Sequence, residues 1–275
     1  MHDSHWISAP GAAGPPRWVC LVGGFVVRAG GRSGPALAVG SRKARTVLAV
    51  LSVNGGRLVH VDRLIDALWT GAPPRHPAAN VATLVSRLRA GLGPTAVEGD
   101  RTGYRLGAGL LVDLDHAAGL VCEAEAAMDR GAAQVALVNA AGAREVLEAG
   151  LVLTDQPDAG WGDPARVRHA ELTRRARHAA AAGALGAGLT RVAVAAAEAA
   201  VRDDPFDEPA YRSLMRALVR TGEPARALMA YERLRGTLTR ELGVDPAPAT
   251  RALHLAILRE DAAQLAVLGC PAAVP

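Results

Sequence analysis

Aromatic residues and cysteines are scarce in this 275-residue sequence: aromatics make up 3% of it, and there are three cysteines. Half of the residues are apolar, but alanine supplies much of that share. Alanine at helical spacing favours closely packed helices over a β-sandwich. Cys20, Cys122 and Cys270 are odd in number and far apart. This pattern argues against a disulfide framework and predicts free thiols in a cytoplasmic, reducing compartment.

Long apolar runs and the common catalytic motifs are also missing. No run approaches the roughly 18 residues that a membrane span requires. The apolar stretch from Trp18 to Val27 is interrupted by Gly23 and Gly24, so it predicts a β-strand rather than a signal peptide. The sequence contains no Gly-x-Ser-x-Gly, His-Glu-x-x-His, Cys-x-x-Cys, Gly-x-Gly-x-x-Gly or phosphate-loop motif. We therefore expect no catalysis, no cofactor, no metal site and no membrane partner.

Charge divides the chain into two halves of opposite sign. Residues 1–112 contain 13 Arg and Lys against 5 Asp and Glu, whereas residues 113–275 contain 18 against 22. The front half is thus strongly basic and the rear half is slightly acidic. A basic half suits a polyanion such as double-stranded DNA. The acidic half does not, so we expect it to bind protein.

The basic half has the element order of a winged helix with an added sheet. Residues 1–17 are rich in Pro, Gly and Ala and are expected to be an unstructured extension. Strands are expected at 18–27 and 37–39, with a short one at 57–59, and helices at 41–53 and 61–69. A third helix at 76–92 precedes a hairpin at 97–112.

The third helix is the most informative segment. Five apolar residues share one stripe at helical spacing. Outside it fall, for the most part, Thr83, Ser86, Arg87 and Arg89. A helix with one buried face and one small, hydroxylated, arginine-bearing face can enter a major groove. The apolar stripe is Val81, Leu84, Val85, Leu88 and Leu92.

Beyond residue 112 the strand signals almost vanish. Seven helices are expected, near 115–130, 132–149, 163–187, 189–203, 207–221, 223–241 and 247–260, with glycines at several of their ends. The last pairs resemble tetratricopeptide repeats of about 34 residues. We therefore predict an α+β winged helix-turn-helix domain at 18–112, an all-α tetratricopeptide-like domain at 113–262 and a tail at 263–275.

Three sequence matches, in this order and spacing, resemble the Streptomyces antibiotic regulatory protein family of transcriptional activators. They are the segment 61–69; Val85-Ser86-Arg87-Leu88-Arg89 with Gly103-Tyr104-Arg105-Leu106; and the rear motifs at 227–234, 241–246 and 253–258. The resemblance covers roughly residues 18–262. It implies an OmpR-like winged helix joined to a bacterial transcriptional activation domain. It also implies binding to direct repeats near a promoter, a second copy alongside, recruitment of RNA polymerase holoenzyme, control of a secondary-metabolite cluster and a place on the nucleoid.

Eight residues are expected to contact DNA. Thr83 and Ser86 would approach base edges, Arg89 would lie nearer the groove and Arg87 would touch phosphate. Arg101 and Arg105 flank the hairpin tip, and Arg42 and Lys43 begin the first helix, where the amides favour phosphate.

Two other functions stay open on the sequence. Small Ala79 and Ala82 on the groove-facing side would suit a tetratricopeptide-type scaffold whose winged helix has lost DNA affinity. A repressor of the same fold would have the same sequence features.

Overall fold

The computed structural model describes residues 15–259 and divides them into two compact units. Among the described residues, the N-terminal unit comprises residues 15–116 together with residues 149–169. The helical unit comprises residues 117–148 and the described residues from 170 onwards. Each unit is described by itself.

A four-stranded sheet opens the N-terminal unit. Its strand order is β3 (Ala36–Leu37), β2 (Val26–Ala29), β1 (Arg17–Cys20) and β7 (Leu110–Val112). Strand β1 pairs antiparallel with β2 and parallel with β7. The prediction of a single strand over residues 18–27 is therefore wrong. The chain turns at Gly23 and Gly24, whose φ angles of 81° and 113° suit glycine, and returns as a second strand.

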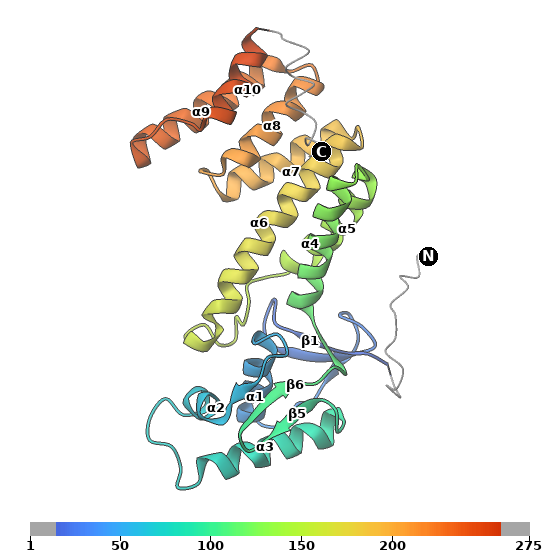
Figure 1. Ribbon diagram of the computed structural model, residues 1–275, viewed down its shortest axis with the longest axis vertical. Helices are drawn as coiled ribbons and strands as arrows, with labels where there is room; N and C mark the ends of the chain where they lie inside the picture. Colours follow the sequence, from blue (N-terminus) through green and yellow to red (C-terminus); the bar gives the residue numbers. More distant parts are fainter. Residues whose placement is uncertain (1–14, 260–275) are drawn as a thin grey trace. The chain divides into compact units, whose positions relative to one another are not determined.

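Three helices follow, α1 (Arg42–Val53), α2 (Val61–Leu68) and α3 (Pro77–Leu92). Ser41 caps α1 by accepting a hydrogen bond from the Ala44 amide. Helix α1 packs against both α2 and α3, and Figure 1 shows α3 running past the β5–β6 hairpin. The second sheet has the order β4 (Val59–His60), β6 (Gly103–Leu106) and β5 (Val97–Asp100).

The hairpin is shorter than the sequence predicts. Only β5 and β6 form it, because β7 leaves to pair with β1 in the other sheet. Gly107 to Gly109 separate the two parts, and a side chain at Gly107 would lie 1.7 Å from the Thr95 carbonyl oxygen. Residues 97–112 therefore serve both sheets of the unit.

Residues 149–169 return to the N-terminal unit from the rear of the sequence. Val152 bridges to Val22, and the Leu153 amide donates to the Leu21 carbonyl at 2.8 Å. The Phe25 amide donates to Asp155 at 3.0 Å. The 18–112 segment is thus completed by residues 149–169, which lie well beyond its end in the sequence.

The helices of the rear half agree closely with the predicted ranges, and residue 260 of the last one lies outside the described residues. They are α4 (Asp113–Asp129), α5 (Ala133–Leu147), α6 (Asp163–Gly186), α7 (Thr190–Asp203), α8 (Glu208–Arg220), α9 (Pro224–Leu242) and α10 (Pro248–Leu258), with a short 3-10 helix at Gly160–Gly162. Helices α4 and α6 begin in the N-terminal unit.

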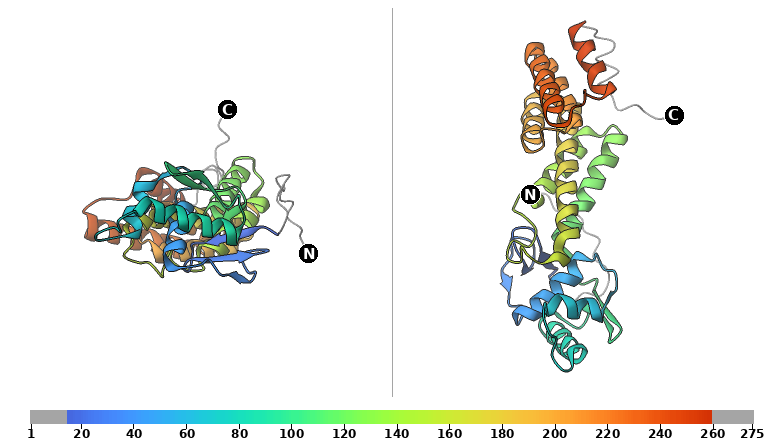
Figure 2. Two further views of the ribbon diagram at one scale, coloured as in Figure 1. Left: turned by 90° about the horizontal axis from the view of Figure 1, so that it is seen from below. Right: turned by 90° about the vertical axis from the view of Figure 1, so that its left-hand side faces the viewer.

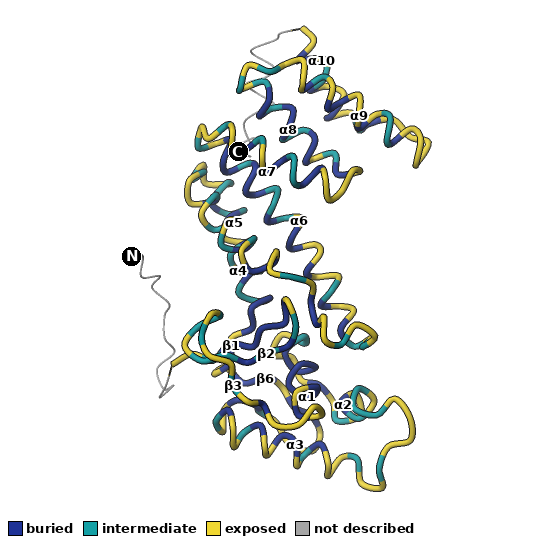
Figure 3. The backbone as a smooth tube through the Cα atoms, turned by 180° about the vertical axis from the view of Figure 1, so that it is seen from behind, coloured by how far each residue is buried: buried dark blue, intermediate teal, exposed yellow. Residues whose placement is uncertain are grey.

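Alanine lets these helices pack closely. A core cluster of the helical unit contains eleven alanines together with Tyr211, Leu214 and Leu234. A side chain at Gly183 would lie 2.8 Å from the Leu137 amide nitrogen of α5. Helices α7, α8 and α9 pack side by side (Figure 2), and Figure 3 shows buried residues along them. Among the described residues, no helix is both long and apolar enough to cross a membrane.

Candidate nucleic-acid interface

Helix α3 has the two faces that its sequence predicts. Its buried residues are Val81, Leu84, Val85, Leu88 and Leu92. Thr83, Ser86 and Arg87 are exposed, and Figure 3 shows buried and exposed positions alternating along the helix. Pro77 stands in the first turn, where its missing N–H costs no hydrogen bond. The apolar stripe fixes the helix against α1, and the polar stripe faces solvent.

Asn80 is a further exposed residue of this stripe that the sequence reasoning missed. It precedes Thr83 by three positions and Arg87 by seven, so all three share one side of the helix. An Asn side chain can make paired hydrogen bonds to adenine in the major groove. Its helical spacing from Thr83 and Arg87 was the signal that could have identified it.

Thr83 is partly engaged within the helix. Its hydroxyl donates to the Ala79 carbonyl at 3.0 Å. The hydroxyl oxygen can still accept a hydrogen bond, and the methyl group remains available for apolar contact. Ser86, one turn further on, is exposed.

Arg89 is held by the hairpin. Its Nε donates to the Val97 carbonyl at 2.8 Å and an Nη donates to the Gly99 carbonyl at 2.9 Å. Its guanidinium also lies 5.9 Å from the centre of the Tyr104 ring. Strand β5 is the outer strand of its sheet, so Arg89 satisfies carbonyls that no strand pairs. In this structure Arg89 therefore joins α3 to the hairpin. The groove position expected from the sequence stays a prediction.

The hairpin places one arginine at its tip and pairs another. Arg101 is exposed in the turn between β5 and β6. Arg105 forms a two-bonded ion pair with Glu98, at 3.0 and 2.7 Å. The tip is shaped by Asp100, which accepts the Thr102 amide at 2.8 Å. Hydrogen bonds from Thr102 lower the pKa of Asp100.

Arg42 and Lys43 line a cavity of about 710 Å³ in the N-terminal unit. The opposite wall is formed by residues 155–161, including Asp155 and Trp161. The Lys43 ammonium lies 4.4 Å from the centre of the Trp69 ring. Both cations are exposed at the first turn of α1, where backbone amides add positive potential.

The exposed cations of α3 and the hairpin tip differ in their availability. Within residues 15–259, Arg87 and Arg101 form no ion pair. Arg105 shares its charge with Glu98, and Arg89 donates to two carbonyls. In the same part of the chain, no group of three His, Cys, Asp or Glu residues could hold a metal ion. The surface around α3 and the hairpin can therefore attract an anion through Arg87 and Arg101 and hydrogen-bond it through Asn80, Thr83 and Ser86.

Comparisons with known proteins place this geometry in a family. Residues 112–258, more than half of the chain, match the family model of the bacterial transcriptional activator domain. The chain is 36% identical over 240 residues to the regulatory protein AfsR of Streptomyces coelicolor, covering 84% of this chain and 23% of AfsR. It is 34% identical over 232 residues to the transcriptional regulatory protein EmbR of Mycobacterium tuberculosis, covering 80% of this chain and 58% of EmbR. The regulatory protein DnrI of Streptomyces peucetius is 28% identical over 248 residues, which cover 80% of this chain and 85% of DnrI.

A solved structure gives the same result. The structure of Mycobacterium tuberculosis EmbR in complex with a low-affinity phosphopeptide matches with a TM-score of 0.79 and 30% identity, covering 90% of this chain and 66% of that one. The chain spans about a quarter of the length of AfsR and somewhat over half of EmbR. The resemblance predicted from the sequence is confirmed: the chain belongs to the Streptomyces antibiotic regulatory protein type of transcriptional activators.

Proposed function

We propose that this chain is a sequence-specific DNA-binding transcriptional activator whose N-terminal unit is a winged helix. In this proposal α3 enters the major groove and the β5–β6 hairpin is the wing. The observation that supports it most is the exposed stripe of α3, on which Asn80, Thr83, Ser86 and Arg87 lie opposite the buried stripe. Members of the family are transcriptional regulators, and we propose no catalytic step.

The proposed contacts fall into two kinds. Asn80, Thr83 and Ser86 would contact base edges, because short polar side chains allow the helix to approach them closely. Arg87 on α3 and Arg101 at the hairpin tip would contact phosphate, and Arg101 would alternatively reach the minor groove.

The remaining predicted residues have supporting roles. Arg105, Arg42 and Lys43 are proposed as further phosphate contacts. Arg105 is paired with Glu98, and Lys43 lies over the Trp69 ring. Arg89 is proposed to hold the wing at a fixed angle to α3, so its contribution to base readout is indirect. This assignment rests on its two hydrogen bonds to β5.

Arg87→Ala tests the proposed interface. Loss of one phosphate contact should weaken binding to specific and random duplex alike and lower the salt slope by about one unit. Fluorescence anisotropy at several salt concentrations measures both quantities. Arg251→Ala, which removes an exposed charge from α10, is the matched control. Unchanged affinity and slope in Arg87→Ala, Arg101→Ala and their double variant would contradict the proposed interface.

We further propose that two copies bind side by side on direct repeats and recruit RNA polymerase holoenzyme. One helix covers only a few base pairs, so a single copy would discriminate poorly. Half-sites about 10–11 base pairs apart would place both copies on one face of the DNA. Inserting about five base pairs should abolish joint binding and activation. If binding and transcription in a purified assay survive the insertion, the copies do not act together.

A scaffold function is the second candidate, favoured by the small Ala79 on the exposed stripe of α3 and by a groove in the helical unit. A salt titration with random duplex separates the two, because a scaffold would show no steep salt dependence. The purified transcription assay separates activator from repressor. We place the chain in the cytoplasm on the nucleoid, with a promoter of a secondary-metabolite cluster as the proposed target.

A further inference from the structure

The helical unit contains a groove that DNA binding leaves unexplained. Helices α7, α8 and α9 enclose a hollow of about 300 Å³ whose lining includes Arg202, Tyr211 and Arg233. A second hollow of about 280 Å³ is lined by Leu214, Leu218 and Met229, among others. Both hollows share Glu198 and Arg233 in their linings, so they are neighbouring parts of one groove. We call it the α7–α9 groove.

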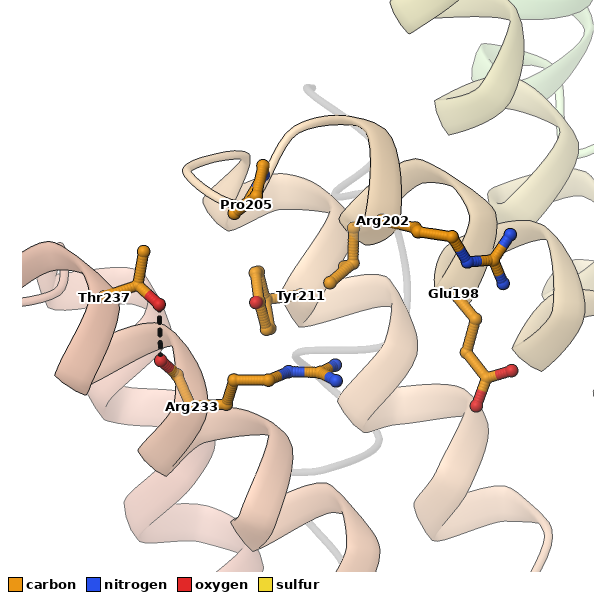
Figure 4. A pocket seen from close by; sticks show the side chains of 7 residues that line it. Glu198, Arg202, Pro205, Tyr211, Arg233 and Thr237 are labelled. Carbon is orange, nitrogen blue, oxygen red and sulfur yellow. Dashed lines mark hydrogen bonds between the residues drawn. The ribbon is translucent and has the colours of Figure 1, made fainter.

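The first hollow carries two arginines without carboxylate partners. Among the residues that the structure describes, neither Arg202 nor Arg233 forms an ion pair. The Arg233 guanidinium lies 5.5 Å from the centre of the Tyr211 ring. Figure 4 shows that Arg202 comes from α7 and Arg233 from α9, and that both side chains extend towards the side on which Glu198 lies.

Glu198 does not neutralise them. Its carboxylate binds Arg226 at 3.1 Å, and Arg226 also binds Glu223 at 2.5 Å. Three arginines and one glutamate therefore line the groove. A carboxylate placed beside Arg202 and Arg233 would receive charge-assisted hydrogen bonds from two guanidinium groups.

The second hollow is apolar. Leu214 and Leu218 form buried walls, whereas Met229 is 71% exposed. An exposed methionine is a flexible apolar surface that adapts to different side chains. The groove thus offers a cationic part and an apolar part joined at Arg233.

We propose that the α7–α9 groove binds a short peptide segment of a partner protein that carries an acidic residue close to an apolar one. The acidic side chain would lie beside Arg202 and Arg233 over Tyr211, and the apolar side chain would pack on Met229, Leu214 and Leu218. Charge complementarity and the exposed methionine select this occupant over a basic or purely polar peptide. The proposal goes beyond DNA binding and does not depend on α3.

The test uses the full chain and three fluorescein-labelled decapeptides composed of Glu and Leu, of Lys and Leu, and of Glu and Ser. Fluorescence polarisation should show the Glu–Leu peptide binding about tenfold more tightly than the other two. The double substitution R202E/R233E should reduce this binding at least about tenfold, and Met229→Ser should reduce it less. The matched control is R251E/R259E, which makes the same charge change at exposed arginines outside the groove lining and should leave binding unchanged.

Three outcomes would overturn the proposal. Equal binding of the Lys–Leu and Glu–Leu peptides would remove the charge argument. Unchanged Glu–Leu binding by folded R202E/R233E would place the peptide elsewhere. A concentration-dependent dimer, seen by light scattering and abolished by R202E/R233E, would make a second copy the occupant. Arg87→Ala should leave peptide binding intact, so failure of the DNA proposal is distinguishable from failure of this one.

Discussion

Arginines in the two units have different surroundings. In the helical unit many are paired within one or two turns of helix, as in Arg174 with Glu171 at 2.9 Å and Arg235 with Glu232 at 2.6 Å. On α3 and the hairpin tip, Arg87 and Arg101 are exposed, and the structure of residues 15–259 gives them no carboxylate partner. Exposed ion pairs contribute little stability, so pairing mainly neutralises charge. The difference indicates which surface of the N-terminal unit is left open to an anion. In the helical unit, Arg202 and Arg233 also have no carboxylate partner among the described residues, and they differ from the paired arginines in lining one hollow together.

The two units also differ in how far apart in the sequence their packed elements lie. The helical unit is built from successive helices closed by glycines such as Gly188, Gly222 and Gly243, each with positive φ. The N-terminal unit instead depends on pairing between strands far apart in the sequence, such as β1 with β7. Asp113 is fully buried and accepts the amides of Leu21 at 2.9 Å, Val22 at 3.1 Å and Leu114 at 2.8 Å. Burial raises the pKa of Asp113, and these three hydrogen bonds oppose the shift.

The largest expected effect is therefore at Asp113. Asp113→Ala would leave three buried or partly buried amides without their acceptor, which should destabilise the N-terminal unit by at least about 3 kcal/mol. Urea unfolding combined with hydrogen exchange in β1 and β2 measures the loss. Asp115→Ala, which breaks an exposed ion pair with Arg168, is the control and should cost under about 1 kcal/mol. Equal losses of unfolding free energy in the two variants would show that the Asp113 hydrogen bonds do not stabilise the N-terminal unit.

Arg89→Ala should have an intermediate effect and sharpens the contrast with Arg87. Removing its bonds to Val97 and Gly99 should cost about 1–2 kcal/mol and speed exchange of the β5–β6 amides. Arg87→Ala should change stability by less than about 0.5 kcal/mol. If Arg89→Ala instead alters base preference at one position with no change in hairpin exchange, its side chain leaves the hairpin when DNA binds.

Glu98→Gln should change stability less than Arg89→Ala does. It should strengthen DNA binding, whereas Arg87→Ala should weaken it. The substitution removes the negative charge that pairs Arg105, so binding to random duplex should strengthen several-fold and the salt slope should steepen. Stability should change by less than about 1 kcal/mol, since both side chains are exposed. Anisotropy titrations measure the affinity. Weaker binding in this variant would mean that the Glu98–Arg105 pair positions the hairpin.

The smallest effect concerns acid stability of the helical unit. Burial tends to raise the pKa of Asp207, but hydrogen bonds from His178 and the Ala210 amide outweigh it, so the pKa lies below its usual value. This stabilisation is full above the unfolded-chain pKa of about 4 and is lost as pH falls through the lower folded value. His178→Ala should reduce the stability of α8 at pH values above the unfolded-chain pKa of Asp207. It should also make the loss of stability on acidification less steep. Urea unfolding from pH 2 to 6 checks this, and an unchanged pH profile would exclude the pair as its source.

Local chemistry in the sequence determined the helices and the two faces of α3. Val81, Leu84, Val85, Leu88 and Leu92 lie at helical spacing, and an apolar stripe of that kind must be buried wherever the helix packs. Ser41 and the glycines at helix ends act within one turn, so their effect is readable without the fold. The seven rear helices followed from the same local signals, and the family followed from the order of short motifs.

Tertiary structure decided what depends on contacts between distant residues. The strand at 110–112 reads locally like the end of a hairpin, yet it pairs with β1. The sequence pattern could not predict this pairing, because local periodicity carries no information about a strand partner at the other end of the unit. Arg89 and Arg87 are two positions apart on one helix, and only the approach of β5 distinguishes their roles. The return of residues 149–169 to the N-terminal unit and the groove between α7 and α9 likewise arise from packing between segments, which residue spacing along the chain does not encode.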